Sequence, residues 1–187
     1  MKRFVTIFLA LVLFGSAVSV ASAATVEEKR QSVRKSVNAT LEKLYQLEPS
    51  AKAAVENNAG YAVFNNFGAK ILVAGGGKGK GLAFNNESKK EVFMGMAEVQ
   101  AGIGFGIKEF SVVFVFVTEE ALNTFVNDGW EFGGQATAAA TDDVSGGAIA
   151  GAVSVSPGVW MYQITKKGLA LEATVKGTRY YKDGDLN

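Results

Sequence analysis

Glycine recurs at every second position in two stretches of this sequence, Gly75 to Gly81 and Gly102 to Gly106. Small residues continue the pattern at alternate positions from Gly134 to Ala140 and from Ala148 to Ala152. Alternate residues of a strand share one face, so these stretches predict strands with one face almost bare of side chains. Two interpretations are open. In the first, helices or bulky aromatic residues pack closely on the bare face, or a small curved barrel needs the room. In the second, the face lines a groove for an acyl chain or another extended ligand.

Period-two alternation of apolar residues predicts that most of the chain after residue 58 is β-structure. The predicted strands are Tyr61–Phe64, Lys70–Ala74, Gly81–Phe84, Val92–Met96, Val99–Ile107, Ser111–Val117, Trp130–Ala140, Ala148–Val155, Val159–Ile164 and Gly168–Tyr181. Between them, Asn65-Asn66, Asn85-Asn86 and Lys108-Glu109 are predicted to be turns.

Helical patterns are confined to three places. Thr25 to Leu47 has apolar residues at helical spacing, and Thr25 with Glu28 forms a capping-box pattern. A short helix is predicted from Ser50 to about Glu56, and another after the N-cap Thr118. The sequence therefore predicts an α+β fold. Its main part is a predominantly antiparallel β domain that forms a curved sheet or a barrel-like structure. The chain is expected to have an N-terminal helical segment (25–57) and a β-rich part (59–187) with one inserted helix.

The N-terminus has the parts of a secretory signal peptide. Met1-Lys2-Arg3 precedes an apolar run from Phe4 to Val20, which ends in the small residues Ala21-Ser22-Ala23. We expect a signal peptide over residues 1–23 and a single domain over 24–187, exported to the periplasm or the periphery of the outer membrane. An uncleaved membrane anchor is the alternative.

The sequence contains no His and no Cys. Their absence removes the usual general base, the catalytic triads and the usual zinc ligands, so we expect no enzyme, no cofactor and no metal site. Asp183-x-Asp185-x-Asn187 has the spacing that begins a calcium loop but lacks the later Glu. With 19 basic and 18 acidic residues, the chain is also not expected to bind nucleic acid.

Basic residues form three candidate patches for a membrane surface. Lys29, Arg30, Arg34 and Lys35 share the polar face of the first helix, where the alternative is an ordinary solvated face. Lys78 and Lys80 lie on one side of the glycine-rich stretch; no Ser or Thr follows Lys80, so this is not a phosphate loop. Lys166 and Lys167 lie near Trp160 in sequence, where the alternative is a hairpin with a core Trp.

Four segments in this order resemble the SYLF domain, also called the Ysc84 or DUF500 domain. They are AGYAVF (59–64), GAKILVAGGGKGKGLAF (68–84), GIKEFSVVFVFVTEEALNTF (106–125) and KKGLALEATVKG (166–177). The resemblance runs from about Leu41 to the last residue.

The resemblance implies a non-enzymatic lipid-binding module whose partner is an anionic phospholipid or membrane surface. Some members of the family bind actin, which is an unlikely partner for an exported bacterial protein. The alternative is a structural or protein-interaction protein of the cell envelope, with an envelope protein as its partner and no lipid ligand.

Overall fold

The computed structural model describes residues 24–71, 74–101, 106–132, 149–170 and 177–187. The predicted signal peptide, residues 1–23, lies outside this range. Within the described ranges, none of the helices combines the length and the apolar character that crossing a bilayer would require.

The three predicted helices are confirmed. The first, α1 (Val26–Leu47), begins at the predicted capping box: the Glu28 amide donates to Thr25 Oγ1 at 3.2 Å, and the Thr25 amide donates to Glu28 Oε2 at 2.7 Å. Helix α2 (Ala51–Asn57) follows Pro49, and α3 (Glu119–Asn127) is capped by the Thr118 hydroxyl. Local capping chemistry therefore determines where α1 and α3 begin.

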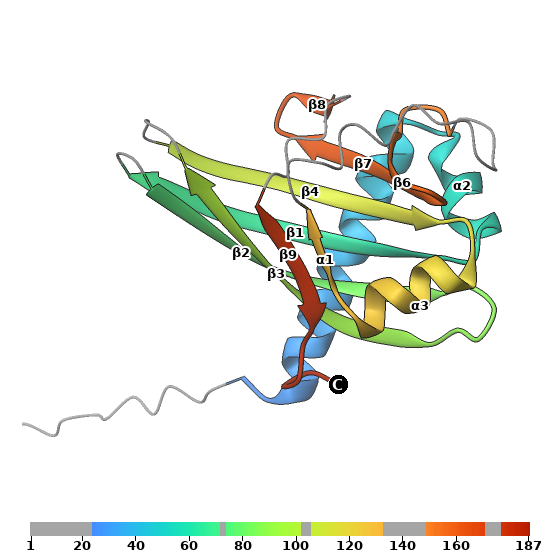
Figure 1. Cartoon of the computed structure of the whole chain (residues 1–187), viewed down its shortest axis with the longest axis horizontal. Coiled ribbons are helices and arrows are strands. Elements are labelled where there is room, and N and C mark those ends of the chain that lie inside the picture. The colour runs from blue at the N-terminus through green and yellow to red at the C-terminus, as the bar shows by residue number, and fades with distance from the viewer. Residues whose placement is uncertain (1–23, 72–73, 102–105, 133–148, 171–176) are drawn as a thin grey trace, which may run out of the picture.

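The described strands form one antiparallel sheet in the order β5-β9-β3-β2-β1-β4-β7-β6, with β8 paired to β7 (Figure 1). They are β1 (Gly60–Ile71), β2 (Ala74–Asn85), β3 (Glu91–Ala101), β4 (Gly106–Phe116), β5 (Trp130–Phe132), β6 (Val153–Ser156), β7 (Val159–Thr165), β8 (Gly168–Ala170) and β9 (Thr178–Lys182). The predicted α+β fold with a curved antiparallel sheet is confirmed.

Two of the three predicted turns are wrong. Asn65-Asn66 lies in the middle of β1, paired with both β2 and β4, and Lys108-Glu109 lies within β4. Asn is depleted from strands, but here both Asn side chains have polar partners inside the fold. Asn85 ends β2 at the turn into β3, as predicted, and its side chain accepts the amides of Glu87 and Ser88.

The sheet curls so strongly that strands far apart in its order touch across the concave side. Tyr180 on β9 lies 4.7 Å from Phe64 and 5.1 Å from Phe114, measured between ring centroids, although β9 and β4 are separated by three strands. Together with Phe125 from α3 and Trp130, these rings form an inner core. The sheet is therefore a half-barrel filled by aromatic residues.

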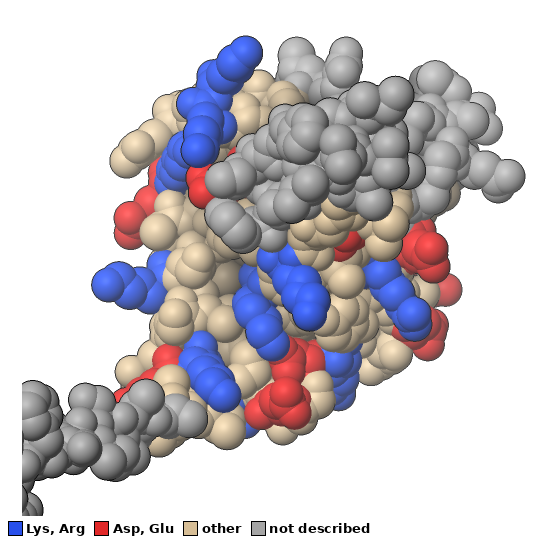
Figure 2. Space-filling model, turned by 90° about the vertical axis from the view of Figure 1, so that its left-hand side faces the viewer, with Lys and Arg blue, Asp and Glu red and all other residues tan. Residues whose placement is uncertain are grey.

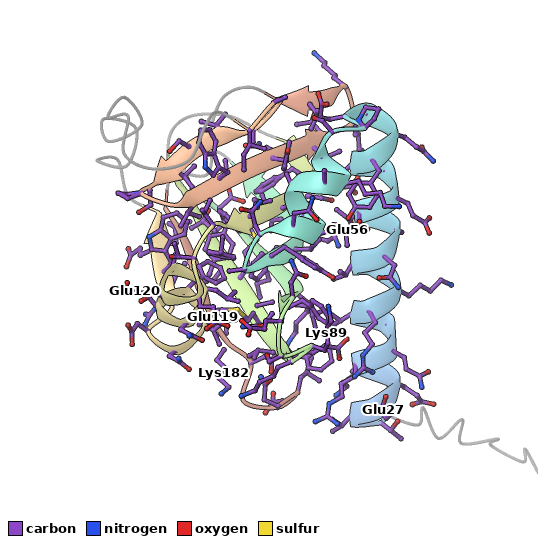
Figure 3. The ribbon with its side chains drawn as sticks, turned by 90° about the vertical axis from the view of Figure 1, so that its right-hand side faces the viewer. Glu27, Glu56, Lys89, Glu119, Glu120 and Lys182 are labelled. Atoms are coloured by element: carbon purple, nitrogen blue, oxygen red, sulfur yellow. The ribbon has the colours of Figure 1, made fainter. Side chains whose placement is uncertain are left out.

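A second, outer core lies on the convex side, where α1 and α2 cover the sheet (Figure 3). Val37 and Leu44 of α1 pack against sheet residues such as Val63, Val113 and Tyr162. Helix α3 belongs to the opposite, inner side. The two apolar faces of the central strands are thus both covered, which explains the nearly continuous apolar run Val112–Phe116.

Aromatic packing, the first of the two interpretations of the glycine pattern, is confirmed on β2. A Cβ added at Gly81 would lie 2.4 Å from the Phe64 ring, and one added at Gly79 would lie 3.2 Å from the Met96 sulfur. The glycines of β2 therefore make room for inner-core side chains. Residues 102–105 and 133–148, where the pattern also occurs, lie outside the described residues.

The last residues of the chain form a hook that fastens β9 to β3. The Asn187 side chain accepts from the Phe93 amide at 3.0 Å and donates to the Phe93 carbonyl at 2.7 Å. Leu186 is buried in the outer core, and the Asp183 carboxylate accepts the Asp185 amide and pairs with Lys80. The spacing that suggested a calcium loop thus serves contacts within the chain.

Buried tyrosines make the fold sensitive to alkaline pH. Burial raises the pKa of Tyr162 to about 12, and its hydroxyl has no hydrogen-bond partner in the part of the chain that the structure describes. Because the folded pKa is above the unfolded value of about 10, this stability is present below pH 10 and lost as pH rises towards 12. We expect Tyr162→Phe to be at least as stable as wild type at pH 8. Between pH 8 and pH 12, its free energy of unfolding should fall by on the order of 2 kcal/mol less than that of the wild type.

Urea unfolding at intervals from pH 8 to pH 12 measures this difference. If the free energies of unfolding of the two proteins fell equally between pH 8 and pH 12, the prediction would be contradicted.

Candidate binding site

A polar row crosses the convex face of the sheet where the outer core ends. Lys80 on β2, Asn65 on β1 and Ser111 on β4 are direct cross-strand neighbours. Two residues away along each strand, the positions on the same face are the buried apolar residues Leu82, Val63 and Val113. The same face therefore changes from core to polar surface within two residues of each strand.

Asn65 is held by side chains from three elements. Its Oδ1 accepts from Ser111 Oγ at 2.5 Å and from Thr40 Oγ1 at 2.9 Å, and its Nδ2 donates to Ser36 Oγ at 2.8 Å. Ser36, Thr40 and Lys43 recur at helical spacing, so they lie along one side of α1. The amide thus connects the helix to the sheet and fixes the polar row.

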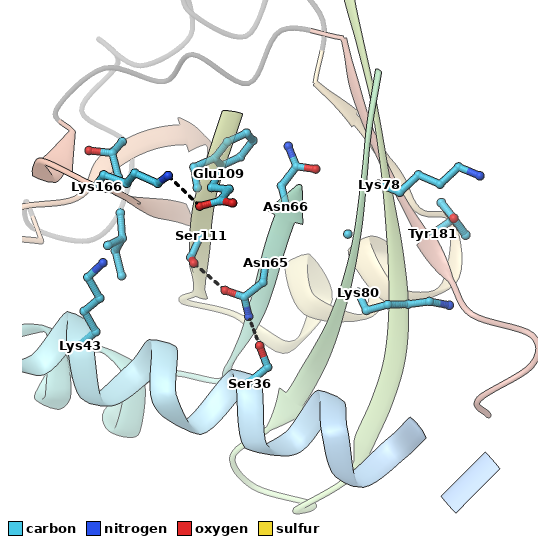
Figure 4. A pocket seen from close by; sticks show the side chains of 14 residues that line it. Ser36, Lys43, Asn65, Asn66, Lys78, Lys80, Glu109, Ser111, Lys166 and Tyr181 are labelled. Carbon is cyan, nitrogen blue, oxygen red and sulfur yellow. Dashed lines mark hydrogen bonds and ion pairs between the residues drawn. The ribbon is translucent and has the colours of Figure 1, made fainter. Parts of the chain in front are cut away.

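An open pocket of about 760 Å³ lies above this row. Its volume is within the usual range for small-molecule sites. It is lined by Ser36, Lys43, Asn65, Asn66, Lys78, Gly79, Lys80, Glu109, Phe110, Ser111, Ile164, Thr165, Lys166 and Tyr181. Lys43 and Lys166 lie at one side of the pocket and Lys78 and Lys80 at the other, with Asn65, Ser111 and Ser36 between them (Figure 4).

The pocket is strongly basic, since four of its lining residues are lysines and one is a glutamate. Lys166 pairs with Glu109 at 3.0 Å, and Lys80 pairs with the buried Asp183. Lys43 and Lys78 form no ion pair within the described parts of the chain. Ammonium, hydroxyl and amide groups around one hollow can bind an anion such as a phosphate ester.

The hairpin end of the molecule carries mixed charge. Figure 2 shows Lys and Arg side chains spread over this end, with acidic side chains among them. The described residues also hold no group of three or more Asp and Glu that could bind a metal ion.

Three of the predicted site residues come together in the pocket: Lys78, Lys80 and Lys166. Lys167 is exposed in the turn between β7 and β8, next to the pocket but not among its lining residues. Trp160 is partly buried and packs against the outer core.

The basic face predicted on α1 is divided by the fold. Arg34 donates to Glu91 at 2.9 Å, Arg30 donates to the Leu186 carbonyl at 2.8 Å, and both guanidinium groups lie over the Phe93 ring. These arginines hold α1 against β3 and the C-terminal hook. Lys29 and Lys35 are exposed on α1 and are not among the lining residues.

Sequence reasoning missed Ser36, Lys43, Asn65, Ser111 and Tyr181. The helical spacing of Ser36 and Lys43 was available in the sequence, but nothing in it indicated which side of α1 would border a pocket. The turn predicted at Asn65-Asn66 places Asn65 outside the sheet, so the sequence does not indicate the polar row.

The fold and the pocket define a class: an α+β half-barrel with a basic pocket beside its N-terminal helix. Residues 97–187 match the model of the Ysc84 family, described as Las17-binding protein actin regulator. This part of the chain belongs to that family, which confirms the resemblance.

The chain is also similar to Beta cell expansion factor A of Aeromonas veronii. The two are 31% identical over 168 residues, which cover 87% of this chain. The chain spans 60% of the length of that relative. Membership of the family supports a module of the lipid-binding type, and the family is not known for enzymatic activity.

Proposed function

We propose that this protein is a non-enzymatic module of the bacterial cell envelope that binds anionic phospholipid through the lysine-lined pocket. The pocket takes the phosphate groups of headgroups, with Lys43 at one side and Lys78 at the other as the principal contacts. The protein is exported, and it acts in the periplasm or at the periphery of the outer membrane.

One observation carries this proposal: lysines from α1, β2 and the β7–β8 turn lie at two sides of one open hollow whose base is a fixed polar row (Figure 4). Each lysine near an anionic surface contributes roughly 1 kcal/mol of attraction. Since Lys43 and Lys78 have no carboxylate partner in the described residues, an anion reaches them without displacing one.

Exposed side chains on the same convex face suit contact with the membrane interface. Val99 is 72% exposed and Tyr181, which also lines the pocket, is 41% exposed. A tyrosine at this position can place its ring among headgroups and glycerol groups while its hydroxyl remains hydrated.

Co-sedimentation with lipid vesicles tests the proposal. We expect the protein, lacking residues 1–23, to bind phosphatidylglycerol-containing vesicles at 20 mM salt. Binding should weaken by at least about tenfold at 500 mM salt, where charges are screened within a few ångströms.

Vesicles of phosphatidylcholine alone are the control and should retain little protein. Equal binding to both kinds of vesicle, or binding that does not change with salt, would contradict recognition of an anionic headgroup.

A further inference from the structure

The inner face of the half-barrel contains a buried carboxylate. Glu98 on β3 is 4% exposed, and its Oε2 accepts one hydrogen bond from Asn66 Nδ2 at 2.6 Å. No lysine or arginine of the described residues forms an ion pair with it. An isolated buried charge is costly, so a carboxylate in this position calls for a positive partner.

Buried oxygen atoms without partners lie on the same face. Thr178 is the direct cross-strand neighbour of Glu98 on β9, and Tyr180 lies one inward-facing position further along that strand. Among the described residues, Thr178 Oγ1, the Tyr180 hydroxyl and Asn66 Oδ1 have no hydrogen-bond partner, and their side chains are 0%, 0% and 5% exposed. Burial raises the pKa of Tyr180, and the charge of Glu98 raises it further, which indicates that the two groups are close.

Glycine provides the space for this cluster. Gly77 on β2 faces Glu98 across the β2–β3 ladder, and a Cβ added there would lie 2.7 Å from Asn66 Oδ1 and 3.0 Å from Glu98 Oε2. Both polar side chains therefore bend over the bare glycine, which brings their oxygens together on the inner face.

We propose that Glu98, Asn66, Thr178 and Tyr180 form a buried site for a small monovalent cation, either an alkali-metal ion or a primary ammonium group. Their oxygens are the hard ligands that such ions accept. One carboxylate neutralises one positive charge, whereas a divalent ion would leave an excess charge in the core. The three N–H groups of an ammonium match a carboxylate, an amide oxygen and a hydroxyl. This inference is independent of the lipid-binding proposal.

Thermal unfolding in different chloride salts at equal ionic strength tests the site. Sodium, potassium and methylammonium are compared with tetramethylammonium, which is larger and has no N–H group. At about ten times its Kd, the bound cation should raise the Tm of the wild type by about 3–6 °C over tetramethylammonium. An effect of sodium or potassium identifies the alkali ion, and an effect of methylammonium alone identifies the ammonium group.

Two variants test whether the cluster is responsible. Glu98→Gln keeps the shape but removes the charge, and it should abolish the difference between salts. Glu131→Gln, which removes an exposed charge on β5, is the matched control and should retain it. Thr178→Val keeps the shape of the side chain, and the Thr178 hydroxyl has no partner among the described residues, so the variant should fold. It should raise the cation concentration needed for half the Tm shift by about tenfold or more.

Equal Tm values for the wild type in all four salts would overturn the proposal. The proposal would also be overturned if Glu98→Gln and Thr178→Val both kept the difference in Tm between the salts.

Discussion

Replacing Gly81 by alanine is expected to lower the free energy of unfolding by roughly 3 kcal/mol. The added Cβ would lie 2.2 Å from the Val63 carbonyl oxygen and 2.4 Å from the Phe64 ring. Contacts this short cannot be relieved by a side-chain rotation alone, because one partner is backbone of the neighbouring strand. Phe64 also packs against Phe114, Phe125 and Tyr180, so its displacement disturbs the whole inner core.

Gly76→Ala on the same strand is the control for this prediction. Gly76 faces the convex side and is exposed, and among the described atoms an added Cβ would meet only the Glu98 carbonyl oxygen at 3.4 Å. Alanine there should be neutral or stabilising by up to about 1 kcal/mol, because glycine in a strand costs conformational entropy. Urea unfolding of both variants at neutral pH measures the difference. Equal stabilities would show that the glycines of β2 do not accommodate the inner core.

Sequence alone predicted the features that depend on neighbouring residues. The capping box at Thr25, the cap at Thr118 and the bare face of β2 each follow from a few consecutive positions, and all three are confirmed. Close packing against the bare glycine face, which the structure confirms, was also one of the two interpretations of the glycine alternation. The sequence pattern does not indicate which aromatic residues fill the space beside the glycines of β2, because residues that meet there, such as Phe64 and Tyr180, are 116 residues apart in sequence.

The pocket was only partly predictable for the same reason. Lys78 and Lys80 were identified from their spacing, but Lys43, Asn65 and Ser111 gather through the pairing of β1 with β4 and the docking of α1. Propensity placed Asn65 and Asn66 in a turn, and tertiary contacts overrode it. Asn66 binds Glu98 on the inner face while Asn65 holds α1 on the outer, so one dipeptide serves both sides of the sheet.

The charge-reversal variant Lys43→Glu/Lys78→Glu is expected to bind anionic vesicles at least about 30-fold more weakly than the wild type. Losing two lysines removes about 2 kcal/mol of attraction, and the new carboxylates add repulsion. Both side chains are exposed and form no ion pair in the described residues, so the fold should persist. The lipid concentration at half-maximal binding, measured by co-sedimentation at 20 mM salt, gives the ratio.

Lys89→Glu/Lys182→Glu changes the net charge by the same amount at positions outside the pocket, towards the β2–β3 turn and α3 (Figure 3). If the pocket binds the headgroup, this control should lose less affinity than the pocket variant, because Lys89 and Lys182 do not line the pocket and change only the general attraction to the vesicle. Similar losses in both variants would indicate attraction by net charge alone, and the pocket would then have no special part in membrane binding. Unchanged binding of the pocket variant, with its Tm intact, would place the lipid contact on another surface.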